Sequence, residues 1–404
     1  MDKKTVFFIG LVWPEPTSSA AGWRIIQLIE LFLQFDYKVI FGSCAQKSDY
    51  SFPLNSLSVE EIQLSLNDAS FDNYIKQLLP DIVVYDRFIT EEQFGWRVKE
   101  FSPKSIQILD TEDLHFLREA RTEAYKNKTT VSLFPLSTLA KRELSSIYRS
   151  DLSLIISEKE EKLLTEQFNI PPELLFYLPF LEKLNKTEYL PNFHERSNFC
   201  FIGNFMHLPN YETVKIIKEI WPTIRKQLPK AEMHIYGAYC TKKVQQLKQP
   251  KEGLYVLGRT ENSQKMMQNY RILLAPIPFG AGLKGKFIDA MHAGTPSVTS
   301  PIGAEGICDD DWPGFFLDEN DTYQNLINLY LDEKLWHEKQ TLGYQLLKQK
   351  FDLNLWSCIF KEKIDDISNN ILSYRNQNIV GTLMQQQGLM ATKYLSKWIE
   401  EKNK

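Results

Sequence analysis

The chain has 404 residues, of which 43% are hydrophobic and 24% are charged, and its formal net charge at pH 7 is -4. This length and apolar content predict two or three folded domains and exclude a largely disordered chain. The small negative charge excludes nucleic acid as the main partner, because binding a phosphate backbone needs an excess of clustered lysine and arginine.

The N-terminal segment and the cysteines bear on the compartment. The five cysteines are scattered and form no C-x-x-C pair, which predicts neither a disulfide framework nor a zinc site and favours the reducing cytoplasm. Residues 3–13 have the basic and apolar pattern of a short signal peptide, but we prefer a first buried strand, because residues 25–33 continue directly as a helix. No apolar run approaches the ~18 residues of a membrane-spanning helix.

Strand and helix patterns alternate through the first half of the chain. Thr90 and Gln93 have the spacing of a capping box, which predicts a helix from there to about Phe101. A polar segment at residues 180–196 that contains Pro191 predicts a domain boundary. The apolar runs predict buried strands at residues 6–13, 37–41, 81–86, 105–110, 152–157 and 175–178.

The second half repeats this alternation. Two such arrays predict an α/β protein with two doubly wound, Rossmann-like parallel sheets, and a ligand in the crevice outside the carboxyl ends of the strands. We place the first domain at residues 1–185, the second at 196–350, and C-terminal helices that cross back to the first domain at 351–404. Strands of the second domain are predicted at residues 199–203, 232–236, 254–257, 272–276 and 297–300.

Residues 272–306 carry the clearest pattern of a binding site. Gly280 and Gly282 allow a tight turn after a buried strand, and Lys284 and Lys286 follow where a helix begins. Backbone amides at a helix start and two cationic side chains are typical of a diphosphate site. Asp289, one turn further on, is suited to accept hydrogen bonds from a ribose diol. The alternative is an ordinary strand-to-helix turn with two solvated lysines.

A second group follows the first strand of the second domain, in the sequence GNFMHLPN. Gly203 and Asn204 suit a close approach of the backbone to phosphate, and His207 can donate a hydrogen bond to it. For His207, a loop histidine without a function is an equally good interpretation.

A third group lies at residues 110–121, after a buried strand. Thr111 or Asp113 is placed to cap a helix, and His115 and Arg118 then share one helix face. The position of His115 at a strand's carboxyl end favours a side chain that faces the interdomain cleft. A capped helix with a structural histidine is the alternative.

Several other sites are not indicated. The sequence contains no nucleophile elbow, no P-loop and no set of residues with metal-ligand spacing. Only Gly22 marks the turn after the first strand, so a G-x-G-x-x-G dinucleotide site is not supported.

The second domain resembles the family 4 glycosyltransferases with the GT-B fold over essentially its whole length. The segments that carry this resemblance are FIGNFMHLPN, IYGAY, APIPFGAGLKGKFIDAMHAGTPSVTS and GAEGI. The first domain is similar to the acceptor half of the family more loosely, through WPEPTSSAAGWR and DTEDLHFLR. The resemblance implies a retaining enzyme that moves a sugar from a nucleotide sugar to a glycan, lipid-linked or small-molecule acceptor. It implies no metal and no cofactor, and a cytoplasmic location that includes peripheral contact with the inner face of the membrane.

The same resemblance implies roles for individual residues. Gly282, Lys284 and Lys286 would lie by the diphosphate, Asp289 by the ribose, and His115 by the donor sugar. Gly22 would lie by the donor phosphates across the cleft. His115, Lys284 and Lys286 are thus the candidate catalytic residues, and the candidate donor-binding residues are Gly22, Gly203, Asn204, His207, Gly280, Gly282, Asp289 and Glu305.

One departure from the family concerns its two glutamates, which commonly lie eight positions apart. Here Ala281 stands at the first position and Asp289 at the second. Ala281 favours an alternative function, a GT-B protein that binds a nucleotide or glycan without turnover. A sugar-nucleotide epimerase on the same architecture is a further alternative.

Overall fold

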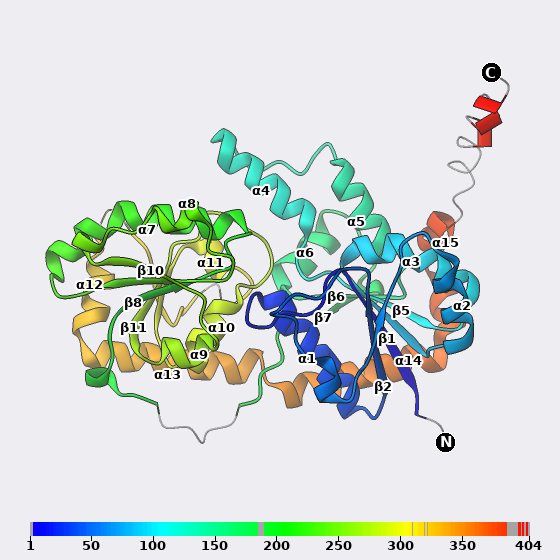
Figure 1. Cartoon of the computed structure of the whole chain (residues 1–404), viewed down its shortest axis with the longest axis horizontal. Coiled ribbons are helices and arrows are strands. Elements are labelled where there is room, and N and C mark those ends of the chain that lie inside the picture. Colours follow the sequence, from blue (N-terminus) through cyan, green and yellow to red (C-terminus); the bar gives the residue numbers. More distant parts are fainter. Residues whose placement is uncertain are drawn as a thin grey trace.

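The computed structural model describes residues 3–184, 190–308, 310–318, 320, 322–385, 395–396, 398–399 and 401–402. Two lobes stand side by side, each built on an open sheet with helices packed around it (Figure 1). All strand pairs within both sheets are parallel, which confirms the predicted α/β class with two doubly wound sheets. In the described residues, no helix is both long and apolar enough to cross a membrane.

The first sheet has seven strands in the order β3-β2-β1-β4-β5-β6-β7. The order reverses between β1 and β4, which is where a ligand crevice forms in such sheets. The strands are β1 (Thr5–Gly10), β2 (Lys38–Ser43), β3 (Glu60–Gln63), β4 (Ile82–Asp86), β5 (Ile106–Asp110), β6 (Leu152–Ile155) and β7 (Leu175–Tyr177). The helices are α1 (Ala20–Gln34), α2 (Ala69–Leu78), α3 (Arg87–Phe101), α4 (His115–Asn127), α5 (Thr138–Arg149) and α6 (Glu158–Glu166).

The central strands of this sheet have mostly continuous apolar sequences, because both faces of the sheet are covered. Successive side chains of a strand point to opposite faces. Val6 and Phe8 of β1 pack into one hydrophobic core, together with α1, whereas Phe7 and Ile9 pack into another, together with α2, α3 and α5. Helices on both faces of a parallel sheet account for this pattern.

The second sheet has six strands in the order β10-β9-β8-β11-β12-β13, and its order reverses between β8 and β11. The strands are β8 (Ser197–Ile202), β9 (Met233–Tyr236), β10 (Leu254–Gly258), β11 (Tyr270–Ala275), β12 (Ser297–Thr299) and β13 (Gly314–Phe316). The helices are α7 (Leu208–Gln227), α8 (Lys242–Gln245), α9 (Ser263–Met267), α10 (Gly285–His292), α11 (Pro301–Ala304), α12 (Gln324–Leu331) and α13 (Glu333–Lys350).

The chain then returns to the first lobe through α14 (Leu353–Gln377), which runs along its lower side in Figure 1. Phe360, Ile364 and Ile367 of α14 belong to the same core as α1 and β1. The last described helix of this lobe, α15 (Ile379–Gln385), packs against α5. Residues 185–189 of the expected boundary and residues 386–394 of the expected C-terminal helices lie outside the described part of the chain.

The predicted capping box at Thr90 and Gln93 is wrong. Helix α3 begins at Arg87, directly after β4, and Asp86 occupies the position before it. Thr90 therefore lies within the helix, where its hydroxyl donates to the carbonyl oxygens of Asp86 and Arg87, each at 3.0 Å. A residue inside a helix has helical backbone angles, whereas an N-cap residue has non-helical ones, so Thr90 does not open this helix.

Candidate active site

A cleft of about 1080 Å³ lies between the two domains. Segments that follow the carboxyl ends of β1, β4 and β5 line it from the first domain, and those that follow β8, β9 and β11 line it from the second. Both points at which the strand order reverses therefore open into the same cleft. Such crevices bind ligands in doubly wound proteins, and this one lies at the upper end of the roughly 300–1,000 Å³ that is usual for small-molecule sites.

The glycine-rich turn joins β11 to α10 on the second domain's wall of the cleft. Gly280 and Gly282 both have positive φ, at 153° and 62°. A Cβ atom on Gly282 would also lie only 2.7 Å from the Cβ of Asp113 in the first domain. Glycine is therefore needed at position 282 for its conformation and for the close approach of the other domain.

Lys284 and Lys286 flank the first residue of α10, and both line the cleft. The Lys284 ammonium donates to the carbonyl oxygen of Gly282 at 2.8 Å, and that of Lys286 donates to Oδ1 of Asn210 at 2.7 Å. Burial lowers the pKa of Lys284 to about 8, and burial together with the charge of Lys284 lowers the pKa of Lys286 to about 7. The carboxylates of Glu305 and Glu160 partly offset the effect of burial on Lys284, whereas the pKa of Lys286 is lowered both by burial and by Lys284. An anion in the cleft would supply countercharge, above all to Lys286.

Asp289 lines the same wall one turn further along α10. Its carboxylate accepts hydrogen bonds from Oγ of Ser263 at 2.7 Å and from Nε2 of Gln264 at 3.0 Å, and burial raises its pKa. Sequence reasoning did not identify Ser263 and Gln264, which begin the short helix α9. Hydroxyl and amide donors, both from residues of the cleft lining, therefore already hold the two oxygens of this carboxylate.

Gly203, Asn204 and His207 also line the cleft, in the turn between β8 and α7. The carbonyl oxygen of Asn204 accepts from Nδ2 of Asn210 at 2.8 Å, so Asn210 connects this turn to the ammonium of Lys286. Burial and the nearby Arg118 lower the pKa of His207. The two turns that the sequence singled out in this domain are therefore adjacent in space.

His115 lies on the opposite wall, as the first residue of α4. Its Nε2 atom is buried and has no hydrogen-bond partner among the described residues, and the nearest oxygen of Asp113 is 3.5 Å away. Burial lowers the pKa of the imidazole to about 4, which leaves the ring neutral at pH 7.

Neither Thr111 nor Asp113 caps this helix, so that prediction is wrong. The carboxylate of Glu143 on α5 accepts instead from the backbone amides of His115, at 3.0 Å, and Phe116, at 2.9 Å. The Asp113 carboxylate pairs with Arg118 at 2.6 Å. Because Glu143 comes from another helix, the local sequence contains no signal for this cap.

The remaining two candidate residues differ in position. Gly22 lines the cleft within the first turn of α1, and its amide donates to Oγ of Ser19 at 3.0 Å. Glu305 is not part of the cleft lining; its carboxylate pairs with the guanidinium of Arg121 at 2.7 and 2.9 Å. Glu305 thus connects the two domains beside the cleft.

Comparison with known proteins identifies the second domain. Residues 196–332 match the family model described as "Glycosyl transferases group 1". The second domain belongs to this family. None of the curated proteins matches the chain.

Solved structures similar to the whole chain share the GT-B fold. TarM aligns over 89% of this chain and 98% of its own, with 10% identity and a TM-score of 0.71. A TarM structure from S. aureus with fondaparinux, α-GlcNAc-glycerol and UDP aligns over 73% of this chain and 58% of its own, with 14% identity and a TM-score of 0.58. HepE of Anabaena with UDP-glucose aligns over 89% and 99%, at 11% identity and a TM-score of 0.69. WaaG, from lipopolysaccharide biosynthesis, aligns over 90% and 99%, at 13% identity and a TM-score of 0.62.

The glycine-rich turn of the group 1 domain is held by two side chains from the first domain. Glu160 of α6 accepts from the amide of Gly282 at 2.6 Å, and Arg121 of α4 donates to the carbonyl oxygen of Gly280 at 2.6 Å. Neither residue was among the sequence-predicted site residues, because nothing local in their helices indicates contact with the other domain.

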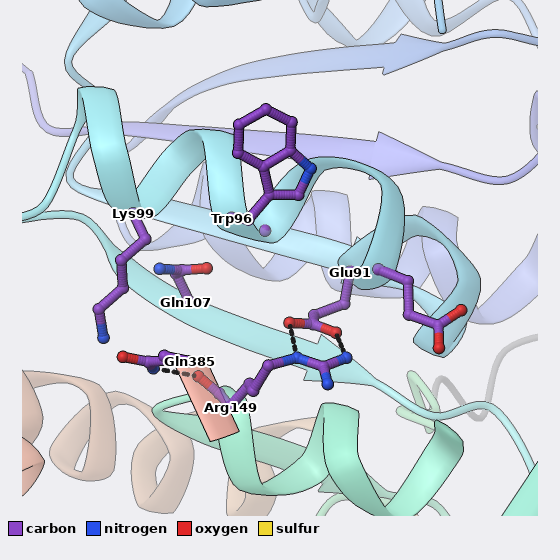
Figure 2. A pocket seen from close by; sticks show the side chains of 8 residues that line it. Glu91, Trp96, Lys99, Gln107, Arg149 and Gln385 are labelled. Carbon is purple, nitrogen blue, oxygen red and sulfur yellow. Dashed lines mark hydrogen bonds and ion pairs between the residues drawn. The ribbon is translucent and has the colours of Figure 1, made fainter. Parts of the chain in front are cut away.

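A second cavity, of about 290 Å³, lies in the first domain among α3, α5 and α15 (Figure 2). Two of its lining residues pair with each other, since the guanidinium of Arg149 donates two hydrogen bonds to the carboxylate of Glu91, at 2.9 and 2.5 Å. None of the sequence-predicted site residues lines this cavity. The interdomain cleft, one wall of which belongs to the domain that matches the group 1 family, is therefore the candidate active site.

Proposed function

We propose that the protein is a retaining glycosyltransferase that moves a sugar from a nucleotide-sugar donor to a hydroxyl group of an acceptor. Membership of the second domain in the group 1 family supports this proposal. Further support comes from similar structures that carry UDP-glucose, in HepE, and UDP, in TarM. The proposed acceptor is a glycan, a lipid-linked sugar or a small molecule.

The observation that carries the proposal is the pair of buried lysines at the start of α10. Cleavage of the bond between the sugar and the diphosphate leaves negative charge on the diphosphate, and this charge grows in the transition state. Two ammonium groups and the first amides of α10 stabilise the charge of the transition state more than that of the ground state. In this proposal Lys284 and Lys286 lie by the diphosphate, Asp289 lies by the ribose, and no metal is required.

His115 is assigned to the donor sugar in the same proposal. His115 lines the cleft, and a neutral imidazole whose buried Nε2 atom has no partner among the described residues can form a hydrogen bond with a sugar hydroxyl. No protein base is assigned, because the leaving phosphate is itself placed to take the proton of the acceptor hydroxyl as the new bond forms.

The test has two stages. Calorimetric titration with uridine, guanosine, adenosine and thymidine diphosphates identifies the nucleotide, and incubation with the matching sugar nucleotides then shows turnover. Sugar transfer or donor hydrolysis with retained configuration, seen by NMR, supports the proposal. Binding without turnover would indicate a binding protein, an epimerised sugar nucleotide would indicate an epimerase, and binding of no nucleotide would overturn the proposal.

A further inference from the structure

Two buried carboxylate oxygens on the first domain's wall of the cleft have no hydrogen-bond partner among the described residues. They are Oδ1 of Asp86 and Oε1 of Glu112. The side chain of Asp86 is 4% exposed and that of Glu112 is 8% exposed. A buried oxygen without a partner destabilises the folded protein, so native structures keep few of them. Two on one wall of a cleft mark a place where donors of a ligand are expected.

The backbone at these positions is also unusual. Arg87, which follows Asp86, has a φ of 69°, and Glu112 itself has a φ of 64°; both are left-handed conformations in residues other than glycine. Asp86 and Asp110 are paired residues at the ends of neighbouring strands β4 and β5, so both unusual conformations occur side by side. Strained backbone that persists at such a point is a feature of binding and catalytic sites.

The charges on this wall argue for the chemical class of the ligand. Three carboxylates interact there, those of Asp86, Asp110 and Glu112, against the guanidinium groups of Arg24 and Arg87. Arg24 is engaged by Asp110 at 2.9 and 3.1 Å, whereas the nearest carboxylate contact of Arg87 is 3.5 Å, to Asp86. Burial and the charge of Asp110 raise the pKa of Glu112 well above its usual value, and burial raises that of Asp86, so negative charge is already unfavourable on this wall. A further anion there, from a phosphate or a carboxylate, is disfavoured, and neutral hydroxyl groups are favoured.

The wall also adjoins the turn assigned to the donor diphosphate. A Cβ atom on Gly282 would lie 3.6 Å from the carbonyl oxygen of Glu112 and 2.7 Å from Cβ of Asp113. A molecule bound against Asp86 and Glu112 would therefore lie beside the donor. Transfer between two substrates requires this proximity.

We propose that Asp86 and Glu112 form an acceptor subsite that accepts hydrogen bonds from two hydroxyl groups of a neutral, polyhydroxylated acceptor, a sugar or polyol. The second oxygen of Asp86 is held by the amide of Leu11 at 3.0 Å, which leaves Oδ1 for the ligand. This proposal rests on the proposed glycosyltransferase function, because the bound molecule is an acceptor only if the protein transfers a sugar.

The experiment measures binding of defined probes in the presence of the nucleoside diphosphate that binds best. The probes are glycerol and the neutral methyl glycosides of glucose, galactose, mannose and N-acetylglucosamine, observed by saturation-transfer NMR. The variants are Asp86→Asn and Glu112→Gln, and the matched control is Glu123→Gln, an exposed carboxylate on α4 that does not line the cleft. In Asp86→Asn the amide oxygen can keep the Leu11 contact, while the NH2 group replaces an acceptor with a donor.

The wild type and Glu123→Gln are expected to bind at least one neutral probe, and each subsite variant is expected to weaken that binding roughly tenfold. Glu112→Asp, which withdraws the carboxylate by one carbon, serves if Glu112→Gln does not fold. Unchanged probe binding in the variants, tighter binding of glucose 6-phosphate or glucuronate, or no neutral probe bound by the wild type would overturn the subsite. Absence of nucleotide binding and sugar-nucleotide turnover, with probe binding that still depends on Glu112, would instead overturn the proposed function.

Discussion

The carboxylate of Glu160 accepts a hydrogen bond from the backbone amide of Gly282 at 2.6 Å, although the two residues belong to different domains. Arg121 makes the complementary contact, with the carbonyl oxygen of Gly280 at 2.6 Å. The first domain thereby holds an amide and a carbonyl of the turn that precedes the two cleft lysines. The position of this turn depends on how the two domains are docked.

The first prediction concerns this contact. Arg121→Met replaces the guanidinium by an apolar side chain of similar length, and so removes the hydrogen-bond donors to Gly280 and Glu305. We expect turnover to fall at least about tenfold while the affinity for the nucleoside diphosphate changes less, because the proposed nucleotide contacts lie mainly in the second domain. Steady-state kinetics and calorimetry measure the two quantities. Arg142→Met, which removes an exposed pair with Glu92, is the control, and an equal effect of both variants would contradict a positioning role.

The second prediction concerns Lys284→Ala and Lys286→Ala. If both amines face the diphosphate, each change should weaken binding of the nucleoside diphosphate by about 1.5 to 3 kcal/mol, the range for hydrogen bonds to charged groups. Binding of the free nucleoside should barely change, because it carries no anion. Calorimetric titration of both ligands distinguishes these cases. Lys265→Ala, on an exposed position of α9, is the control; equal small effects on both ligands would place the phosphates elsewhere.

The third prediction is a pH dependence of nucleotide binding. Burial lowers the pKa of Lys286 to about 7 and that of Lys284 to about 8, and a bound diphosphate should raise both pKa values because it stabilises the ammonium form. The affinity is therefore full below pH about 7 and falls as the pH rises through these free-protein pKa values, by up to about tenfold per pH unit for each lysine. The affinity of the Lys286→Arg variant, whose side chain stays charged, should fall less steeply with rising pH. Calorimetric titration with the nucleoside diphosphate from pH 6 to 9 measures the slope of affinity against pH for the wild type and for this variant. Equal slopes would refute the placement of Lys286 at the diphosphate.

The fourth prediction concerns His115. Replacement by alanine should lower turnover by at least about tenfold with little change in melting temperature, since Nε2 of the imidazole has no partner within the described protein. Because burial lowers the pKa of His115 to about 4, its titration should not limit turnover near pH 7. Kinetics and thermal unfolding provide the test. An unfolded variant whose residual folded fraction keeps full activity would instead assign His115 a structural role.

The fifth prediction is that activity survives strong chelation. The two lysines and the start of α10 supply the positive charge that a divalent metal would otherwise bring to the leaving diphosphate. Turnover with and without EDTA, after dialysis against chelator, measures the effect. Complete loss of activity that manganese restores would show that a metal is required.

The sequence determined by itself what depends on neighbours along the chain. Apolar runs predicted the buried strands, and the order glycine turn, lysines, helix placed Lys284 and Lys286 at the start of α10, because both patterns repeat over a few residues. Two of the four edge strands were not predicted, β3, which has the polar sequence EEIQ, and β13, which has the short sequence GFF.

The tertiary structure alone decided which distant side chains meet. Glu143 caps α4 from 28 positions away, Glu160 reaches a turn 122 positions along the chain, and Arg121 pairs with Glu305 across 184 positions. The partnerless oxygens of Asp86 and Glu112 come together only because β4 and β5 are neighbours in the sheet. Local periodicity indicates which face of a helix or strand is buried, but it does not indicate which other element packs against that face. The chemistry of the cleft depends on which elements pack together.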